Sequence, residues 1–322
     1  MSRVRLIPFK LEEVLDSATE ETPYGIQMIN APELWEQGVK GKAAVIAILD
    51  TGCDSSHPDL KDRIIGGKSF VEGDEGDYSD SHFHGTHVAG TVAASLNGQG
   101  VTGAAPEAQL LILKVLGDDG SGSYEGITDA IRYAAEWKGE NGETVRVISM
   151  SLGGPEDVPE LHEAIRDAVA KQILVVCAAG NEGDGREETS EQAYPGFYKE
   201  VVQVGAINEK KELADFSNTN DEIDLVAPGV NILSTYPGGK YAKLSGTSMS
   251  TPHASAAAAL LIQKEEKEFG RALTEPEVYA QLCKNTVSIG LSKKAEGNGL
   301  VFLRASEQER ADTKKPSAEA SK

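Results

Sequence analysis

Apolar runs that end at polar or glycine-rich residues recur along the chain, and they restrict its fold more than any other feature. Residues 43–49 are apolar throughout and are followed by Asp50. Further runs span 110–116, 145–150, 173–178 and 201–206, with a shorter one at 223–226. Such runs are typical of strands covered on both faces of a parallel sheet. Because helical stretches separate them, we predict a doubly wound α/β fold, with a mostly parallel sheet and helices on both faces.

Composition limits the partners and the compartment. The 322-residue chain has a formal net charge of -20, which argues against nucleic acid or an anionic membrane as a partner. Cys53, Cys177 and Cys283 lack the spacing of a disulfide framework or a zinc site. No apolar run is long enough for a signal peptide or a membrane span, so we expect a soluble, cytoplasmic protein.

A serine-rich segment at 244–253 leads into the alanine-rich run 254–262. The pattern predicts a buried helix with Pro252 in its first turn. Ser248 would then lie where unpaired backbone N–H groups stabilise negative charge, which suits a nucleophile. Taken alone, the segment favours the simpler interpretation that Ser245, Thr247 and Ser248 are candidate helix caps.

Two distant residues favour the nucleophile. Asp50 ends a predicted strand, and His84 opens a predicted helix. A serine hydroxyl needs a neutral imidazole to take its proton, and the imidazole needs a carboxylate to orient it. The order Asp50, His84, Ser248 differs from that of α/β-hydrolases, which excludes a lipase or esterase of that kind. A metal site at the histidine cluster 82–87 is a weaker alternative, because no further ligand stands nearby.

Five segments resemble the signature motifs of the subtilisin family of serine proteases, with the intracellular subtilisins the most similar. They are Ile48-Leu49-Asp50-Thr51-Gly52, His84-Gly85-Thr86-His87-Val88-Ala89-Gly90, Met150-Ser151-Leu152-Gly153-Gly154, Ala179-Gly180-Asn181-Glu182-Gly183, and Gly246-Thr247-Ser248-Met249 with Pro252-His253. The resemblance covers about residues 23–303. It implies a serine endopeptidase in which Ser248 is the nucleophile, His84 the base and Asp50 its orienting carboxylate. Asn181 would donate a hydrogen bond to the oxyanion.

The resemblance also implies how peptide or unfolded protein substrates bind. An extended substrate would pair with two strands and place a large side chain in a pocket of small residues, Ala193 among them, where Glu182 adds tolerance for a basic group. The implied substrate-binding residues are Gly120, Ser121, Gly122, Ser151, Leu152, Gly153, Ala178 and Glu182.

A calcium site is implied by the same resemblance. Its ligands would come from Asp59, Ser95, Asn97, Gln99 and Val101, and carboxylate, amide and carbonyl oxygens are the ligands that Ca²⁺ prefers. Glu20 lies where the family often has Gln, which leaves that ligand open.

The N-terminal segment permits two interpretations. Leu6, Ile7, Pro8 and Phe9 precede an acidic stretch, and residues 1–21 could be a frayed tail. The resemblance instead implies an inhibitory extension that lies across the active site and is removed by cleavage within about residues 10–21. We therefore expect an inhibitory extension at 1–21, a catalytic domain at 22–303 and a flexible tail at 304–322. A homodimer is a further implication.

Three departures from the family pattern affect specificity or packing. Phe83 stands where Gly or Ser is usual, Ser250 replaces Ala, and 254–256 replaces Val-Ala-Gly. None removes a predicted catalytic residue. The alternatives are a catalytically inactive subtilisin-like protein that binds peptides, a secreted protease, and a cysteine protease, for which no cysteine has a catalytic context.

Overall fold

The computed structural model describes residues 3–42, 44–74 and 76–304, and a nine-stranded sheet lies at the centre of these ranges. The strands follow one another across the sheet as β14 (Thr286–Val287), β15 (Leu300–Val301), β11 (Ile223–Pro228), β10 (Val201–Ile207), β9 (Leu174–Ala178), β7 (Val145–Met150), β3 (Val45–Asp50), β5 (Gln109–Lys114) and β4 (Ile64–Ser69). All neighbours are parallel except β14 and β15. The predicted sheet is confirmed, with strand ends that differ by one or two residues.

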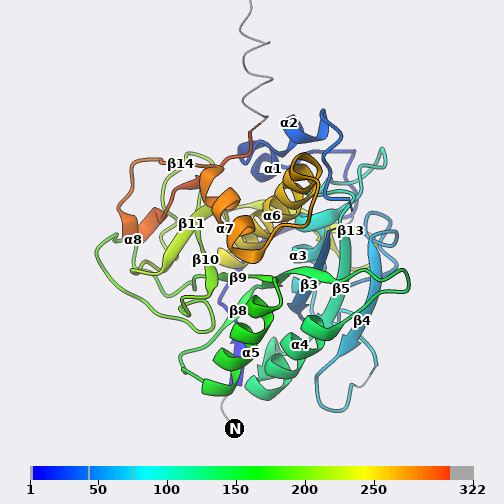
Figure 1. Ribbon diagram of the computed structural model, residues 1–322, viewed down its shortest axis with the longest axis horizontal. Coiled ribbons are helices and arrows are strands. Elements are labelled where there is room, and N and C mark those ends of the chain that lie inside the picture. The colour runs from blue at the N-terminus through cyan, green and yellow to red at the C-terminus, as the bar shows by residue number, and fades with distance from the viewer. Residues whose placement is uncertain (1–2, 43, 75, 305–322) are drawn as a thin grey trace, which may run out of the picture.

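Alternate residues of each central strand face opposite sides of the sheet. In β3, Ile46 and Ile48 join one hydrophobic core, whereas Val45, Ala47 and Leu49 join the other. Helices cover both sides, with α4 and α5 below the sheet and α6 and α7 above it in Figure 1. The first core is covered by α1 (Tyr24–Met28), α2 (Ala31–Trp35), α3 (His84–Ala93), α6 (Thr247–Phe269) and α7 (Glu275–Lys284), the second by α4 (Tyr124–Glu136) and α5 (Pro159–Ala170), while α8 (Lys293–Glu296) packs beside β11.

The position of Pro252 differs from the prediction. Helix α6 begins at Thr247, so Pro252 lies inside the helix, beyond its first turn. Proline lacks the N–H that would bond to the carbonyl four residues earlier, which is that of Ser248. The hydroxyl of Ser151 donates to this carbonyl instead, at 2.9 Å. A side chain from a neighbouring segment therefore replaces the missing helical hydrogen bond.

The N-terminal segment forms two strands, and its interpretation as a frayed tail is wrong. Strand β1 (Arg3–Leu6) lies between β6 (Ser121–Ser123) and β8 (Leu152–Gly153) and is antiparallel to both. Strand β2 (Lys10–Leu15) pairs with β13 (Lys240–Ser245), which pairs with β12 (Ile232–Tyr236). At the other end, Arg304 donates to the carbonyl of Thr286, and the rest of the predicted tail lies outside the described residues.

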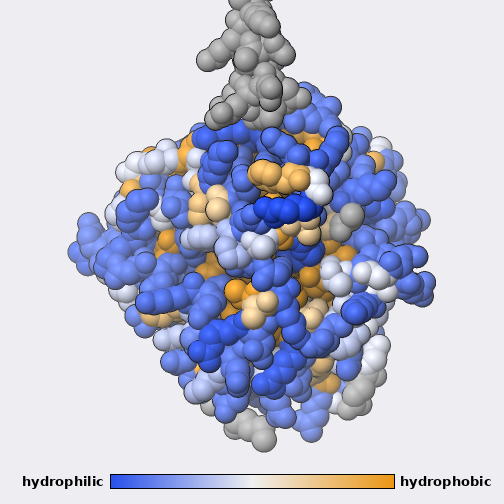
Figure 2. Space-filling view, in the orientation of Figure 1, coloured by the Kyte–Doolittle hydropathy of each residue, from blue (hydrophilic) through white to orange (hydrophobic). Residues whose placement is uncertain are grey.

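The face shown in Figure 2 is mostly hydrophilic, with apolar residues in small groups, as the charged composition predicts. None of the helices in the described ranges combines the length and the apolar character that a membrane crossing requires.

Candidate active site

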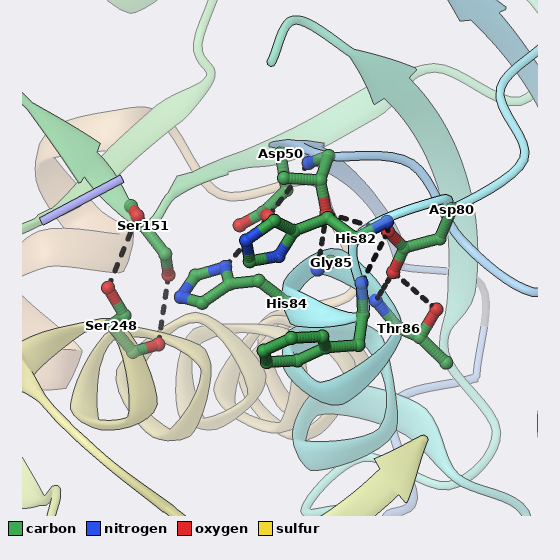
Figure 3. A network of polar contacts seen from close by, with 10 residues as sticks. Asp50, Asp80, His82, His84, Gly85, Thr86, Ser151 and Ser248 are labelled. Atoms are coloured by element: carbon green, nitrogen blue, oxygen red, sulfur yellow. Dashed lines mark hydrogen bonds and ion pairs between the residues drawn. The ribbon is translucent and has the colours of Figure 1, made fainter. Parts of the chain in front are cut away.

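Asp50, His84 and Ser248 meet where strand β3 and the first turns of helices α3 and α6 come together (Figure 3). The imidazole lies between the other two side chains, and its Nδ1 is 2.8 Å from Asp50 Oδ1. All three residues are at most 1% exposed. The carboxylate therefore holds the proton on Nδ1 and leaves Nε2 as the acceptor. Nε2 has no hydrogen-bond partner among the described residues.

The hydroxyl of Ser248 donates to the carbonyl of Ser151 at 3.2 Å, not to His84. Ser151 thus bonds to Ser248 twice, because its own hydroxyl donates to the Ser248 carbonyl. Hydrogen bonds between a nucleophile and its base often form fully only when substrate is bound. In Figure 3 the side chain of Ser248 lies next to the imidazole of His84.

Asn181 follows strand β9, and its side-chain amide is held in one orientation. Its Oδ1 accepts from Thr247 N at 2.9 Å and from Thr247 Oγ1 at 2.8 Å, so its Nδ2 is free to donate elsewhere. Nδ2 lies 2.5 Å from the carbonyl oxygen of Pro8. Thr247, which the sequence suggests only as a candidate helix cap, therefore orients the Asn181 amide.

The two predicted substrate-binding segments flank the N-terminal strand β1. On one side Val4 is opposite Gly122 and Arg5 is opposite Ser121, and Leu6 N donates to Gly120 O at 2.8 Å. On the other side Arg5 is opposite Gly153 and Leu6 is opposite Leu152. Strand β1 therefore lies in an extended conformation between the two segments predicted to bind substrate.

The predicted pocket of small residues is filled by Ile7, which is 2% exposed. A Cβ placed on Gly153 would lie 3.4 Å from Ile7 Cδ1 and 3.5 Å from Ala193 Cβ. Ala178 is buried at the end of β9. Glu182 is exposed and accepts a hydrogen bond from Asn218 Nδ2 at 2.9 Å, so its suggested contact with a basic substrate group stays a prediction.

Phe9 lies against an aromatic cluster beside the site. Its ring centroid is 5.0 Å from that of His84, 5.8 Å from that of Phe83 and 5.9 Å from that of His82. Phe83 also stacks on Tyr236 at 5.2 Å. Phe83, one of the departures from the family pattern, therefore forms a contact surface for Phe9.

Asp80 organises the start of α3, a role that no sequence motif predicted. Its Oδ1 accepts from the backbone N–H groups of His82 and Phe83, and its Oδ2 accepts from both the N–H and the hydroxyl of Thr86 (Figure 3). A carboxylate at a helix N-terminus satisfies unpaired donors there and interacts favourably with the helix dipole. The signal available in the sequence was an Asp four residues before His84.

The predicted calcium ligands lie together in one loop region. Asp59 is fully buried, and its carboxylate accepts from Asn97 Nδ2, Val101 N and Tyr241 Oη at 3.0–3.1 Å. These three donors are all uncharged. Ser95 N donates to Asp59 O, and Gln99 N donates to Asn97 Oδ1. Glu20 reaches the same loop by accepting from Gly98 N at 2.9 Å.

The other histidines and the cysteines have separate environments. His87 Nε2 faces the carbonyls of Ile232 and Ala242, and burial lowers the pKa of His87 to about 3. In the described part of the chain, no three His, Cys, Asp or Glu side chains are grouped as metal ligands. All three cysteines are free, and burial raises the pKa of Cys177 to about 12 and that of Cys53 well above its ordinary value. A buried thiol of high pKa is a poor nucleophile.

Comparison with known proteins agrees with this geometry. Residues 41–311 match the subtilase family. An intracellular serine protease of Paenibacillus polymyxa is 56% identical over 95% of this chain and 92% of its own length. The major intracellular serine protease of Bacillus subtilis is 54% identical over 95% of both chains, and subtilisin E of the same species is 42% identical over 92% of this chain and 74% of its own.

The predicted family, its enzymatic activity and its intracellular class are confirmed by these relatives. The chain belongs to the subtilase family and is a subtilisin-type serine protease.

Proposed function

We propose that this protein is an intracellular serine endopeptidase made as a zymogen, in which the N-terminal extension occupies the substrate groove. The observation that carries the proposal is the hydrogen bond from Asn181 Nδ2 to the carbonyl oxygen of Pro8. A carbonyl at this position, two residues beyond a strand that is paired along both sides, is what a bound peptide would present. Residues 1–21 are the inhibitory segment, and 22–303 form the catalytic domain.

The catalytic steps follow from the three central side chains. Ser248 Oγ attacks the substrate carbonyl while His84 Nε2 takes the hydroxyl proton, and Asp50 stabilises the imidazolium that forms. Asn181 Nδ2 and the Ser248 backbone N–H donate to the oxyanion, where a single such donor contributes about 3 kcal/mol. His84 then protonates the leaving amine, which leaves an acyl-enzyme. Water hydrolyses that ester by the same proton transfers in reverse.

The extension resists this chemistry because two requirements of a substrate are met by different residues. Ile7 fills the pocket between Gly153 and Ala193, whereas the carbonyl next to Asn181 belongs to Pro8. In a productive complex one residue supplies both the pocket side chain and the reacting carbonyl. Pro8 also has a fixed φ and no N–H to pair with the groove. The ring of Phe9 covers His84 as well.

The rival function is a catalytically inactive protein that only binds peptides. An intact-mass time course of the full chain in calcium, run beside Ser248→Ala, separates the two. Loss of an N-terminal fragment from the wild type alone, with peptide hydrolysis rising in step, supports the zymogen. Full-rate hydrolysis without trimming would mean that the extension does not inhibit. Failure of Ser248 to react with a fluorophosphonate, together with absent hydrolysis, would favour the binding protein.

Calcium would be held at the Asp59 loop. A fully buried carboxylate whose hydrogen-bond donors are all uncharged suits a cation, and the nearby Asn97 side chain, Glu20 carboxylate and loop carbonyls supply further oxygens. Rotation of the Asn97 amide by 180° would direct its oxygen toward such an ion and would replace the hydrogen bond that Oδ1 accepts from Gln99 N. Tyr241 of strand β13 donates to the Asp59 carboxylate. A Ca²⁺ ion held by Asp59 would therefore fix its loop against β13 and stabilise the folded state.

The substrates would be peptides or unfolded proteins, because recognition through backbone pairing needs an extended chain. The cytoplasm is the compartment in which such an enzyme would act, where its three free thiols remain reduced. The homodimer, and the absence of nucleic acid and membrane partners, stay predictions.

A further inference from the structure

We propose that His82, Phe83 and Tyr236 form a pocket that selects substrates with an aromatic side chain immediately after the cleaved bond. This inference rests on the proposed function. It adds a preference for the residue that follows the scissile bond. The three side chains are defined below as the aromatic wall.

Phe9 marks where that side chain would bind. It follows Pro8, whose carbonyl lies beside Asn181. When the register is counted from that carbonyl, and not from the pocket that Ile7 fills, Phe9 takes the first position on the leaving side. A Cβ placed on Gly246, two residues before Ser248, would lie 3.3 Å from Phe9 Cβ. After Phe9 the chain pairs with β13, starting with Lys10 opposite Ser245.

The aromatic wall is held in place by contacts within itself. Phe83 stacks on His82 with ring centroids 4.5 Å apart and on Tyr236 with centroids 5.2 Å apart. Phe9 meets His82 and Phe83 edge-on, at interplanar angles of 75° and 80°. Edge-to-face contacts favour aromatic rings over aliphatic groups of similar size. Because the stacking does not involve Phe9, the wall would persist once the extension has been removed.

The backbone of Phe83 indicates that this arrangement is maintained against a conformational cost. Its φ is 122°, in a region that residues with a side chain rarely adopt. The carboxylate of Asp80 holds the turn by accepting from the N–H groups of His82 and Phe83. Glycine would fit this conformation without strain. Residues with a strained backbone that neighbouring groups hold in place cluster at functional sites. At this position a glycine would have no side chain, whereas Phe83 provides the ring at the centre of the aromatic wall.

The test uses two quenched fluorescent peptides that differ only in the residue after the scissile bond, Phe in one and Ala in the other. The full chain is first incubated with calcium, and mass spectrometry confirms that both peptides are cut at the same bond. We expect kcat/KM to be about tenfold or more higher for the Phe peptide. Phe83→Ser should lower this ratio about threefold or more, because one ring contact is lost.

Phe269→Ala removes an exposed Phe far from the site and should leave the ratio unchanged. A merely structural effect of Phe83→Ser would slow both peptides equally and leave the ratio intact, which would overturn the inference. If the wild type cleaves the two peptides at equal rates, the inference is overturned, even if the variant fails to fold. The proposed protease function would still stand in that case, because both peptides are hydrolysed. Absence of hydrolysis of either peptide would refute both.

Discussion

The hydrogen bond from Ser151 to the Ser248 carbonyl should stabilise the enzyme because Pro252 has removed the usual donor. Ser151 and Ser248 are both fully buried, and the bond is 2.9 Å long. Ser151→Ala leaves the buried carbonyl without a donor, which costs about 1–3 kcal/mol. Pro252→Ala would restore a backbone N–H that can bond to that carbonyl within α6. In the Pro252→Ala background, the cost of Ser151→Ala should therefore fall below about 1 kcal/mol.

A double-mutant cycle measures this coupling. All four proteins carry Ser248→Ala to prevent self-digestion, and their unfolding in guanidinium is followed by the fluorescence of the two tryptophans. Differences in unfolding free energy come from the transition midpoints at a common slope. The expected coupling between the two sites is about 1 kcal/mol or more. Equal costs of Ser151→Ala in both backgrounds would refute the idea that the serine substitutes for the missing helical donor.

Three further predictions follow from individual contacts. Phe9→Ala removes three ring contacts of about 0.5–1.5 kcal/mol each, so intact-mass measurements should show faster trimming of the extension; an unchanged rate would contradict the anchoring of this segment by Phe9. If Asp59 holds the proposed calcium, EGTA should lower the thermal stability of the wild type but not that of Asp59→Asn, whereas an equal response of both proteins would contradict a calcium site at Asp59. Burial raises the pKa of Glu275 from 4.5 to about 7, so the folded state retains a proton that the unfolded state releases, and stability falls as pH rises through that range. Glu275→Gln should therefore stabilise the protein at pH 8 but not at pH 4, and equal shifts at both pH values would show that burial of this charge is not the cause.

Much of the fold could be predicted from the sequence because its signals are local. The runs that became β3 and β9 are apolar up to Asp50 and throughout, respectively, and those of β7 and β10 are largely apolar, as a parallel sheet buried on both faces requires. The motifs around Asp50, His84 and Ser248 lie at strand or helix ends, so their convergence follows from the topology. The position of Pro252 could not be predicted, because the start of α6 depends on contacts with Ser151 and Asn181 from other segments.

The sequence by itself determined the sheet and the family and marked Asp50, His84 and Ser248 as candidates, since each signal is encoded by neighbours along the chain. The tertiary structure alone decided how distant groups combine: which residue's carbonyl meets Asn181, how the rings of Phe9 and Phe83 meet, and which donor replaces the N–H that Pro252 lacks. These contacts join residues far apart in sequence, and a hydrogen bond or ring contact depends on distances of a few tenths of an ångström. No local pattern of residues specifies such distances, because they are set by how the packed elements lie against one another.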